Sequence, residues 1–314
     1  MGDAPLAWAA RNGHEAVVEL LLSRADIDPD KPGEEDQTPL MLAARYGHEG
    51  VVKMLLGRDD VNPNKLDEDG ETSLMWAVLG GHEGVVKLLL GQGNIDPDRP
   101  GEVGQTPLML AACTGHEEVV KMLLERDDVN PDNSDNQGQT PLSCAAGGGH
   151  TGVVEILLGR HDVNPDKPDN SGRTPLWGAA YRGYDEVVKI LLERDDVNPD
   201  KPDNEGRTPL WSATYSGNDG VVKMLLERDD VNPNSADEEG QTPLLRAADY
   251  GYELIVEMLL ERDDINPNMP DKLGQTPLSY ATEKGNAGVV EILLQRSDVT
   301  DNKLDIEPVL FPGI

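Results

Sequence analysis

The stretch 135–158, DNQGQTPLSCAAGGGHTGVVEILL, decides the fold because its pattern returns throughout the chain. Its tripeptide Thr-Pro-Leu begins at Thr38, Thr106, Thr140, Thr174, Thr208, Thr242 and Thr276, with degenerate copies at Ala4 and Thr72. Successive starts are 34 residues apart, so nine copies account for almost all of the 314 residues. A fixed period of this length is typical of a repeat architecture.

The fourth copy shows the elements that we expect in every unit. Thr106 and Pro107 suit the N-cap and first position of a short helix, and Gly115 suits its end. His116 then opens a second helix with one apolar stripe, formed by Val119, Val120, Met122, Leu123 and Leu124. The segment 129–139 is rich in Asn, Asp, Gly and Pro and predicts a loop or hairpin.

Such a unit cannot bury its apolar stripe alone. Each buried Val, Leu or Met contributes roughly 1.5–3 kcal/mol, whereas ordering the chain costs about 1–2 kcal/mol per residue. Burial becomes sufficient only when neighbouring copies cover both sides of the unit. The pattern therefore predicts a solenoid with a thin, continuous core.

The composition agrees with a solenoid and excludes several functions. Asp plus Glu is 59 and Lys plus Arg is 27, which gives a formal net charge of −32. So acidic a chain is not suited to nucleic-acid phosphates or to anionic lipid surfaces. The hydrophobic fraction of 37% and the aromatic fraction of 4% are low for one large core. A one-dimensional stack of helix pairs explains both values without disorder.

Cysteine usage and the missing targeting signals suggest where the protein works. Cys113 and Cys144 cannot form a disulfide framework for the whole chain, which favours a reducing compartment. The N-terminus lacks the pattern of a signal peptide, and no run of roughly 18 apolar residues predicts a membrane span. We therefore expect a monomer in the cytoplasm, with the nucleus as the alternative.

The units resemble ankyrin repeats from residue 3 to about residue 302. The motif D-x-x-G-x-T-P-L-x-x-A-A-x-x-G-H-x-x-V-V-x-x-L-L stands in full at 135–158. The resemblance implies an all-α ankyrin-repeat solenoid of nine stacked helix-turn-helix units joined by long hairpin-like loops. It implies one array over 1–302, with 303–314 as a C-terminal tail or cap. Arrays of near-identical repeats of this kind occur in fungi, often as the recognition part of larger receptor-like proteins.

The sequence departs from the ankyrin pattern in ways that affect the loops. The family usually has His after Thr-Pro-Leu, and its bonding role between units must be replaced, because the slot holds Ala7, Met41, Met75, Met109, Ser143, Trp177, Trp211, Leu245 and Ser279. The segment that follows the second helix is shorter, and the hairpin is longer, than is usual in the family. Together these two changes explain the period of 34 residues. Tetratricopeptide repeats share this period, but their longer helices are not joined by such Pro-, Gly- and Asp-rich loops.

Ankyrin-repeat proteins grip partners along a concave groove, at the ends of the first helices and the loop tips. These slots vary here, and the candidates for partner contact are Tyr46, Trp177, Tyr181, Arg182, Trp211, Tyr215 and Tyr250. Aromatic residues at one phase of adjacent units are typical of interface hot spots. For the two tryptophans, packing within the core is the alternative. We expect a non-catalytic scaffold that binds a protein or peptide, of basic character, on this face.

The acidic loops support an alternative function, a structural or sensing array stabilised by divalent cations. Alternating Asp and Asn side chains resemble those of calcium loops: Asp26, Asp28 and Asp30; Asp128, Asn130 and Asp132; Asp162, Asn164 and Asp166; Asp196, Asn198 and Asp200. The glycine and distal glutamate of an EF-hand are missing, so each loop offers only part of a calcium site. The other interpretation is that these side chains cap helices and close turns.

The sequence gives no convincing signal of catalysis, and no cofactor other than calcium is expected. The stretch 147–152, GGGHTG, matches G-x-G-x-x-G, but it joins two expected helices and does not follow a strand. Five histidines open the second helix in successive units, namely His14, His48, His82, His116 and His150. A hydrogen bond at the turn explains this shared slot better than metal binding or catalysis.

Overall fold

The computed structural model describes residues 4–300, which form eighteen α-helices, one 3-10 turn (Glu34–Asp36) and no strand. The helices are α1 Pro5–Arg11, α2 Glu15–Leu22, α3 Pro39–Arg45, α4 Glu49–Leu56, α5 Ser73–Leu79, α6 Glu83–Leu90, α7 Pro107–Thr114, α8 Glu117–Leu124, α9 Pro141–Gly148, α10 Thr151–Leu158, α11 Pro175–Arg182, α12 Asp185–Leu192, α13 Pro209–Tyr215, α14 Asp219–Leu226, α15 Pro243–Tyr250, α16 Glu253–Leu260, α17 Pro277–Lys284 and α18 Ala287–Leu294. The predicted all-α array of helix pairs is confirmed. The tail predicted at 303–314 lies outside the described residues.

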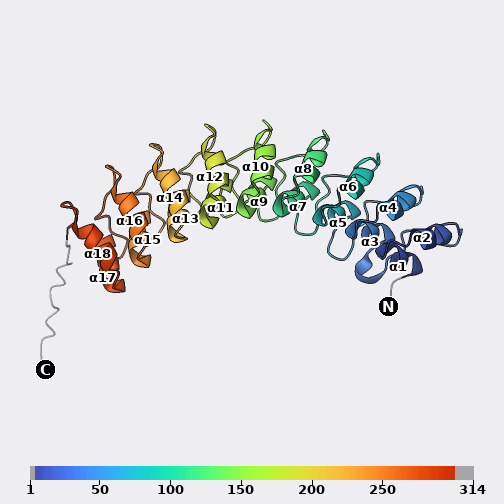
Figure 1. Ribbon diagram of the computed structural model, residues 1–314, viewed down its shortest axis with the longest axis horizontal. Coiled ribbons are helices and arrows are strands. Elements are labelled where there is room, and N and C mark those ends of the chain that lie inside the picture. Colours follow the sequence, from blue (N-terminus) through green and yellow to red (C-terminus); the bar gives the residue numbers. More distant parts are fainter. Residues whose placement is uncertain (1–3, 301–314) are drawn as a thin grey trace, which may run out of the picture. The chain divides into compact units, whose positions relative to one another are not determined.

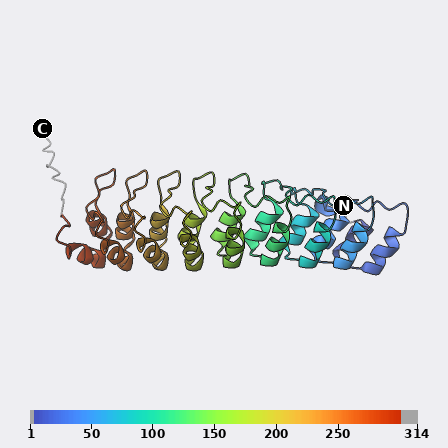
Figure 2. The same ribbon diagram turned by 90° about the horizontal axis from the view of Figure 1, so that it is seen from above.

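The described chain divides into two compact units. The first comprises residues 4–179 and 186–197, and the second comprises 180–185 and 198–300. Within each unit, helix pairs follow one another in chain order, with the first helices in one row and the second helices in another (Figure 1). The loops project from one side of these rows (Figure 2).

Local sequence explains where the helices begin and end. The Thr106 hydroxyl accepts a hydrogen bond from the Met109 N–H (3.3 Å), and Pro107 occupies the first turn of α7. Gly115 ends α7 with a φ of 77°, in the left-handed region that glycine adopts at little cost. The same devices recur in most repeats and place the first helices in register.

The core is a thin layer between successive helix pairs. In the fourth repeat, Leu108 and Ala111 of α7 and Val120 and Leu123 of α8 are fully buried. The small alanine lets the first helices approach closely, and the valine and leucine stripe fills the space between the rows. Equivalent positions are buried along both units, as the repeat phase predicts.

The loops are hairpin-like but form no strand within residues 4–300. Most tips share one geometry, in which the Asp135 N–H donates to the Gln139 carbonyl (3.0 Å) and Asp135 Oδ1 accepts from the N–H groups of Gln137 and Gln139. Where glycine replaces the aspartate, as at Gly101, only the backbone bond is present. Neighbouring tips are also bonded, since the Asn136 N–H donates to the Val103 carbonyl (3.1 Å). The loops are thus tied to each other as well as to their helices.

A histidine that precedes the second helix links neighbouring repeats at His48, His82 and His150. Nε2 of His48 lies 3.0 Å from the Arg11 carbonyl, and Nε2 of His150 lies 2.9 Å from the Cys113 carbonyl. These carbonyls are at the end of the preceding first helix and have no partner within that helix. The predicted hydrogen bond therefore exists, but it crosses between repeats instead of closing the histidine's own turn. Asn218 fills the slot with a similar bond to the Tyr181 carbonyl (3.0 Å).

An arginine after most of the second helices forms a second link, which we call the arginine clamp. Its Nη1 donates to the last carbonyl of the preceding second helix, as in Arg58 to Leu22 (2.8 Å), Arg126 to Leu90 (2.9 Å) and Arg160 to Leu124 (3.1 Å). The same guanidinium forms two bonds to the aspartate two residues later, and the bonds from Arg126 lower the pKa of Asp128.

The third repeat lacks the clamp. Gln92 and Asn94 replace the arginine and the aspartate, and the Gln92 amide donates only to the Leu88 carbonyl of its own helix (3.3 Å). A hollow of about 350 Å³ lies at this position, lined by Leu56, Arg58, Asp59, Val61, Pro63, Gln92, Gly93 and Asn94. The interface between α4 and α6 is therefore held by one link fewer than its neighbours.

The double substitution Gln92→Arg with Asn94→Asp should stabilise the protein. It restores the side chains that reach the Leu56 carbonyl in the other repeats, and a bond to a charged donor at a partly buried site contributes about 1 kcal/mol or more. Urea unfolding followed by circular dichroism should show a higher midpoint. Gln92→Arg alone, which lacks the orienting carboxylate, should give a smaller gain. An unchanged midpoint for the double variant would contradict the clamp.

Candidate functional site

Three exposed tyrosines at the ends of consecutive first helices form the main candidate surface. Tyr181, Tyr215 and Tyr250 are 41%, 37% and 44% exposed, although each side chain is large and apolar over most of its area. They lie in the last turns of α11, α13 and α15, and all three belong to the unit of residues 180–185 and 198–300. We call these three residues the tyrosine patch.

The rings of the tyrosine patch contact one another. Tyr181 stacks on Tyr215 with centroids 6.4 Å apart, and Tyr215 meets Tyr250 edge-on at 5.6 Å. Beneath them, Trp211 stacks on Tyr215 at 5.2 Å and is only 4% exposed. Tyr252 extends the cluster below Tyr250, at 5.6 Å. Aromatic pairs at these separations stabilise each other, so the patch is rigid before any partner arrives.

Charged groups border the tyrosine patch. The Arg246 guanidinium lies over the rings of Trp211 and Tyr215, 5.3 Å and 5.9 Å from their centroids. Asp249 lies between two cations, 3.6 Å from Arg246 and 3.5 Å from Lys284. Burial and a hydrogen bond with Tyr215 raise the pKa of Tyr250, so its hydroxyl stays protonated at neutral pH.

The other predicted contact residues do not join this patch in the same way. Tyr46 is 41% exposed but lies in the other unit, where the guanidinium of Arg11 approaches its ring (5.7 Å). Trp177 is 7% exposed, so both tryptophans are packed in the core, as the alternative interpretation predicted. Arg182 is exposed at the end of α11, beside Tyr181.

The acidic loop residues are engaged with the protein itself. The first aspartate of each set pairs with the clamp arginine: Asp26 with Arg24, Asp128 with Arg126, Asp162 with Arg160 and Asp196 with Arg194. The second residue accepts from the backbone N–H two positions later in all four sets, through Asp28, Asn130, Asn164 and Asn198. These are the capping and turn roles of short polar side chains.

The third residue of a set bonds to the next loop. Asp30 accepts from the Asn62 N–H (2.9 Å), Asp132 from the Asn164 N–H (3.3 Å) and Asp200 from the Asn232 N–H (3.3 Å), and Asp166 occupies the equivalent place. Among residues 4–300, no group of three or more His, Cys, Asp or Glu side chains is placed to hold a metal ion. The geometry favours the capping interpretation over the calcium alternative.

The comparison with protein families agrees with the geometry of the helix pairs. A family model described as ankyrin repeats (3 copies) matches residues 6–100, 58–135, 96–169, 128–203, 160–237 and 229–303, which cover nearly the whole chain. The chain belongs to the ankyrin-repeat family. Ankyrin repeats are generally protein–protein interaction modules. A search of curated proteins gave no match.

The ankyrin-repeat pattern is altered at the position after Thr-Pro-Leu, and the structure shows what replaces histidine. In the second repeat, Met41 Sδ accepts from the Thr38 N–H (3.3 Å), and in the fifth, Ser143 Oγ accepts from the Thr140 N–H (2.7 Å). Both bonds stay within one repeat. The contact between ankyrin repeats is made by His48, His150 and their equivalents at the start of the second helices.

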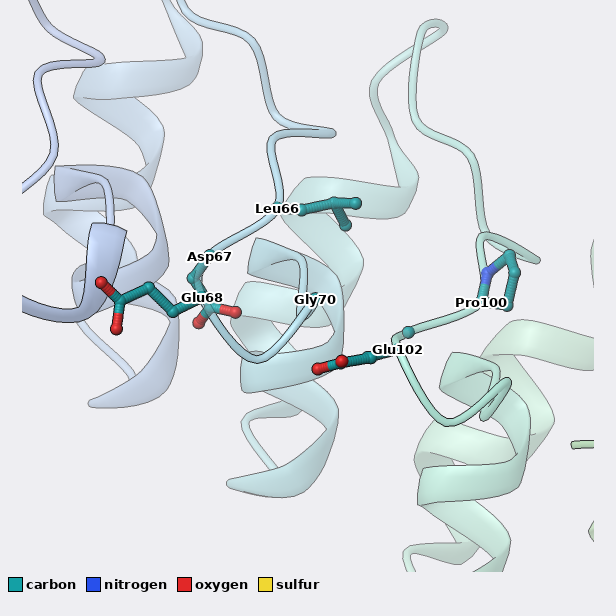
Figure 3. A pocket seen from close by; sticks show the side chains of 7 residues that line it. Leu66, Asp67, Glu68, Gly70, Pro100 and Glu102 are labelled. Atoms are coloured by element: carbon teal, nitrogen blue, oxygen red, sulfur yellow. The ribbon is translucent and has the colours of Figure 1, made fainter. Parts of the chain in front are cut away.

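A second hollow of this ankyrin-repeat protein lies between the loop tips of its second and third repeats (Figure 3). It measures about 310 Å³ and is lined by Leu66, Asp67, Glu68, Gly70, Pro100, Gly101 and Glu102. Leu66 and Pro100 supply apolar walls, and Glu102 extends toward Gly70 of the neighbouring loop (Figure 3). The hollow therefore combines an apolar surface with carboxylates.

Glu71 makes the loop beside this hollow unusual. The other repeats have Gln or Arg at its slot, and in two of them the arginine pairs with the loop aspartate, as Arg207 does with Asp203 (2.7 Å). Glu71 instead lies near Asp67 and Asp69, and its buried Oε2 has no hydrogen-bond partner. Burial and the two neighbouring carboxylates raise the pKa of Glu71 to about 7.

Replacing Glu71 by Gln should stabilise the protein at pH 8 and leave it unchanged near pH 4. The folded state holds the Glu71 proton up to about pH 7, whereas the unfolded chain releases it near the ordinary glutamate value, so stability is lost as the pH rises between these values. We expect a gain of about 1 kcal/mol at pH 8, because water reaches and screens part of the carboxyl. Urea midpoints at both pH values measure it.

Glu68→Gln is the matched control for Glu71→Gln, since it removes an exposed carboxylate from the same loop. Its effect should be small and similar at both pH values. A gain for Glu71→Gln that does not depend on pH would show that the carboxyl remains ionised throughout. Sequence comparison alone marks Glu71, because it is the one acid at this slot in the eight loops that join repeats.

Across residues 4–300, no helix combines the length and the apolar character needed to cross a bilayer. Each helix in the array has eight residues or fewer.

Proposed function

We propose that the protein is a non-catalytic scaffold that holds a basic protein or peptide on the tyrosine patch. The observation that carries the proposal is the contact between three partly exposed rings over a buried tryptophan. Tyrosines offer a large contact area at low entropic cost, and ones already packed against each other lose little freedom on binding.

Two observations support a basic partner. The formal net charge of −32 attracts cationic chains over a distance and raises the rate of association. The Arg246 guanidinium over Trp211 and Tyr215 also shows that these ring faces accept a guanidinium. An arginine of a partner on the exposed tyrosines would gain roughly 0.5–2 kcal/mol from cation–π attraction. We place this scaffold in the cytoplasm as a monomer, in keeping with its two free thiols.

The experiment is a selection of binders from a random peptide display library, followed by affinity measurements. We expect the selected peptides to be rich in Arg and Lys, and their binding to weaken with salt. The triple variant Tyr181→Ala, Tyr215→Ala, Tyr250→Ala should weaken the Kd of a selected peptide at least tenfold, which is about 1.4 kcal/mol. Fluorescence anisotropy with a labelled peptide gives the Kd.

Tyr46→Ala is the matched control, because Tyr46 is as exposed as Tyr181 but lies in the other unit. It should leave the Kd unchanged. Circular dichroism of the triple variant verifies that its helices are intact. If that folded variant keeps the affinity of the unaltered protein, the tyrosine patch is not the binding surface.

A further inference from the structure

The two cysteines of the chain occupy neighbouring helices of the first unit. Cys113 lies near the end of α7 and Cys144 lies in α9, and these first helices of the fourth and fifth repeats pack side by side (Figure 1). Both thiols are free and partly exposed, and they hydrogen-bond to each other. The thiols are therefore in contact without a covalent bond.

The repeat geometry independently shows that these two slots meet. The residues equivalent to Cys113 and Cys144 in other neighbouring repeats are also in contact, as in Arg45 with Trp76, where the guanidinium is 4.1 Å from the ring centroid. Tyr215 and Arg246 form another such pair, at 5.9 Å. Each pair joins the end of one first helix to the middle of the next. The fold itself thus brings the two thiols together.

Chance placement does not account for this pairing well. A packed residue touches about 6–12 others, so a second cysteine placed at random in a chain of 314 residues would contact the first in only a few per cent of cases. The other repeats fill the two slots with varied residues, including Leu79 with Leu110 and Gly147 with Gly178. Packing alone does not require cysteine there.

Small residues leave room around the thiols. Gly147, which follows Cys113 by one repeat, has open space where a side chain would begin. The chain between the two cysteines includes the whole of α8 and the loop that follows it, so a disulfide would link two repeats instead of closing one turn. A small oxidant can reach the partly exposed sulfurs, and the helix ends have space to adjust.

We propose that Cys113 and Cys144 form an oxidative modification site, which a hydroperoxide such as hydrogen peroxide closes to a disulfide between the fourth and fifth repeats. The Cys113 thiolate attacks one peroxide oxygen, the O–O bond breaks and hydroxide leaves, which gives a sulfenic acid. The Cys144 thiolate then attacks that sulfur, the S–O bond breaks and a second hydroxide leaves. With the two thiol protons, one peroxide yields one disulfide and two water molecules.

The order of attack follows from the contact between the sulfurs. The hydrogen bond from Cys144 lowers the pKa of Cys113, whereas the same bond and burial raise the pKa of Cys144. Cys113 is therefore the first nucleophile, since the thiolate is the reactive form. Cys144 loses this hydrogen-bond partner once Cys113 is oxidised and becomes the resolving thiol.

The disulfide would tie the end of α7 to the middle of α9, in addition to the bond between His150 and the Cys113 carbonyl. Cross-linking residues that are a whole repeat apart restricts the unfolded chain, so the oxidised protein should melt at a higher temperature than the reduced one. This inference does not rest on the proposed binding to the tyrosine patch, which lies in the other unit.

The test uses the full chain, reduced and then treated with hydrogen peroxide. We expect both free thiols to disappear, the intact mass to fall by two hydrogen atoms, and peptide mapping to give one cross-linked pair. Phenylarsine oxide, which bridges adjacent thiols, should bind the reduced chain one to one. Cys144→Ser should accumulate a sulfenic acid at Cys113 that dimedone traps, and Cys113→Ser should react with peroxide at least tenfold more slowly.

Three results would overturn the proposal. Thiols that survive peroxide, a mass that rises by added oxygen, or disulfides that join two molecules would each show that the pair does not close. Serine is close to cysteine in size, so both single variants should keep the helical spectrum, and neither should bind the arsenical. If either single variant still binds it, the two thiols are not its shared site.

Discussion

Replacing Gly115 by Ala should destabilise the protein by about 3 kcal/mol. A side chain at a φ of 77° costs roughly 1–2 kcal/mol, because L-residues rarely adopt the left-handed region. The new Cβ would also lie 2.5 Å from Nδ1 of His150, so the imidazole has to move. Its bond to the Cys113 carbonyl (2.9 Å) is then lost at a further cost of about 1 kcal/mol. Urea unfolding followed by circular dichroism measures the sum.

Gly285 provides the matched control for Gly115. Its φ is 76°, but apart from its neighbours in the chain no atom of residues 4–300 lies within 4 Å of the position that a Cβ would take. Gly285→Ala should therefore cost only the same backbone term of roughly 1–2 kcal/mol. The combination of Gly115→Ala with His150→Ala isolates the clash, because the second change leaves nothing for the new Cβ to meet. Equal losses for the two glycine variants would contradict a contact between Gly115 and the histidine ring.

Replacing Arg126 by Ala should cost about 2 kcal/mol. The change removes two bonds to Asp128 and the bond to the Leu90 carbonyl (2.9 Å), and it leaves that carbonyl of α6 without a partner. Losing a charged donor from a partly buried acceptor costs about 1.5–3 kcal/mol. The midpoint of thermal unfolding should fall accordingly, and amide exchange should rise first at the end of α6.

Arg24 is the matched control for Arg126. It forms the same paired bonds with Asp26, but among residues 4–300 its guanidinium donates to no carbonyl at the end of another helix. Both side chains are exposed, and such ion pairs contribute little. Arg24→Ala should leave the unfolding midpoint nearly unchanged. If both arginine variants have equal effects, the bond to the preceding helix is not what stabilises the array.

The sequence predicts well what lies within one repeat. Thr106, Gly115 and the valine and leucine stripe determine one helix pair through local preferences, and the nine copies average out errors. The packing of Trp177 and Trp211 was anticipated as one of two alternatives. The calcium alternative stays an untested prediction, because spacing shows that oxygens are close in sequence, but not that backbone N–H groups bond to some of them.

Contacts between repeats could not be predicted, because the period does not tell which slots of two neighbours meet. The sequence therefore does not indicate that Arg246 lies over Trp211 of the preceding repeat. The sequence does not predict the arginine clamp either. Its acceptor is a backbone carbonyl, and every residue type carries one, so the acceptor leaves no mark in the sequence. The sequence does contain one sign of the clamp. An arginine recurs two residues before an aspartate after the second helices, and Gln92 is the exception to this pattern.

The missing clamp at Gln92 determines how the array should come apart under load. In a linear stack each repeat holds only its neighbours, so a pulling force divides the chain at its weakest joint. That joint lies between α4 and α6, where the hollow beside Leu56 replaces the guanidinium. Helices α1 to α4 should therefore detach as one segment, at a lower force than the helix pairs on either side of this interface need to separate from their other neighbours.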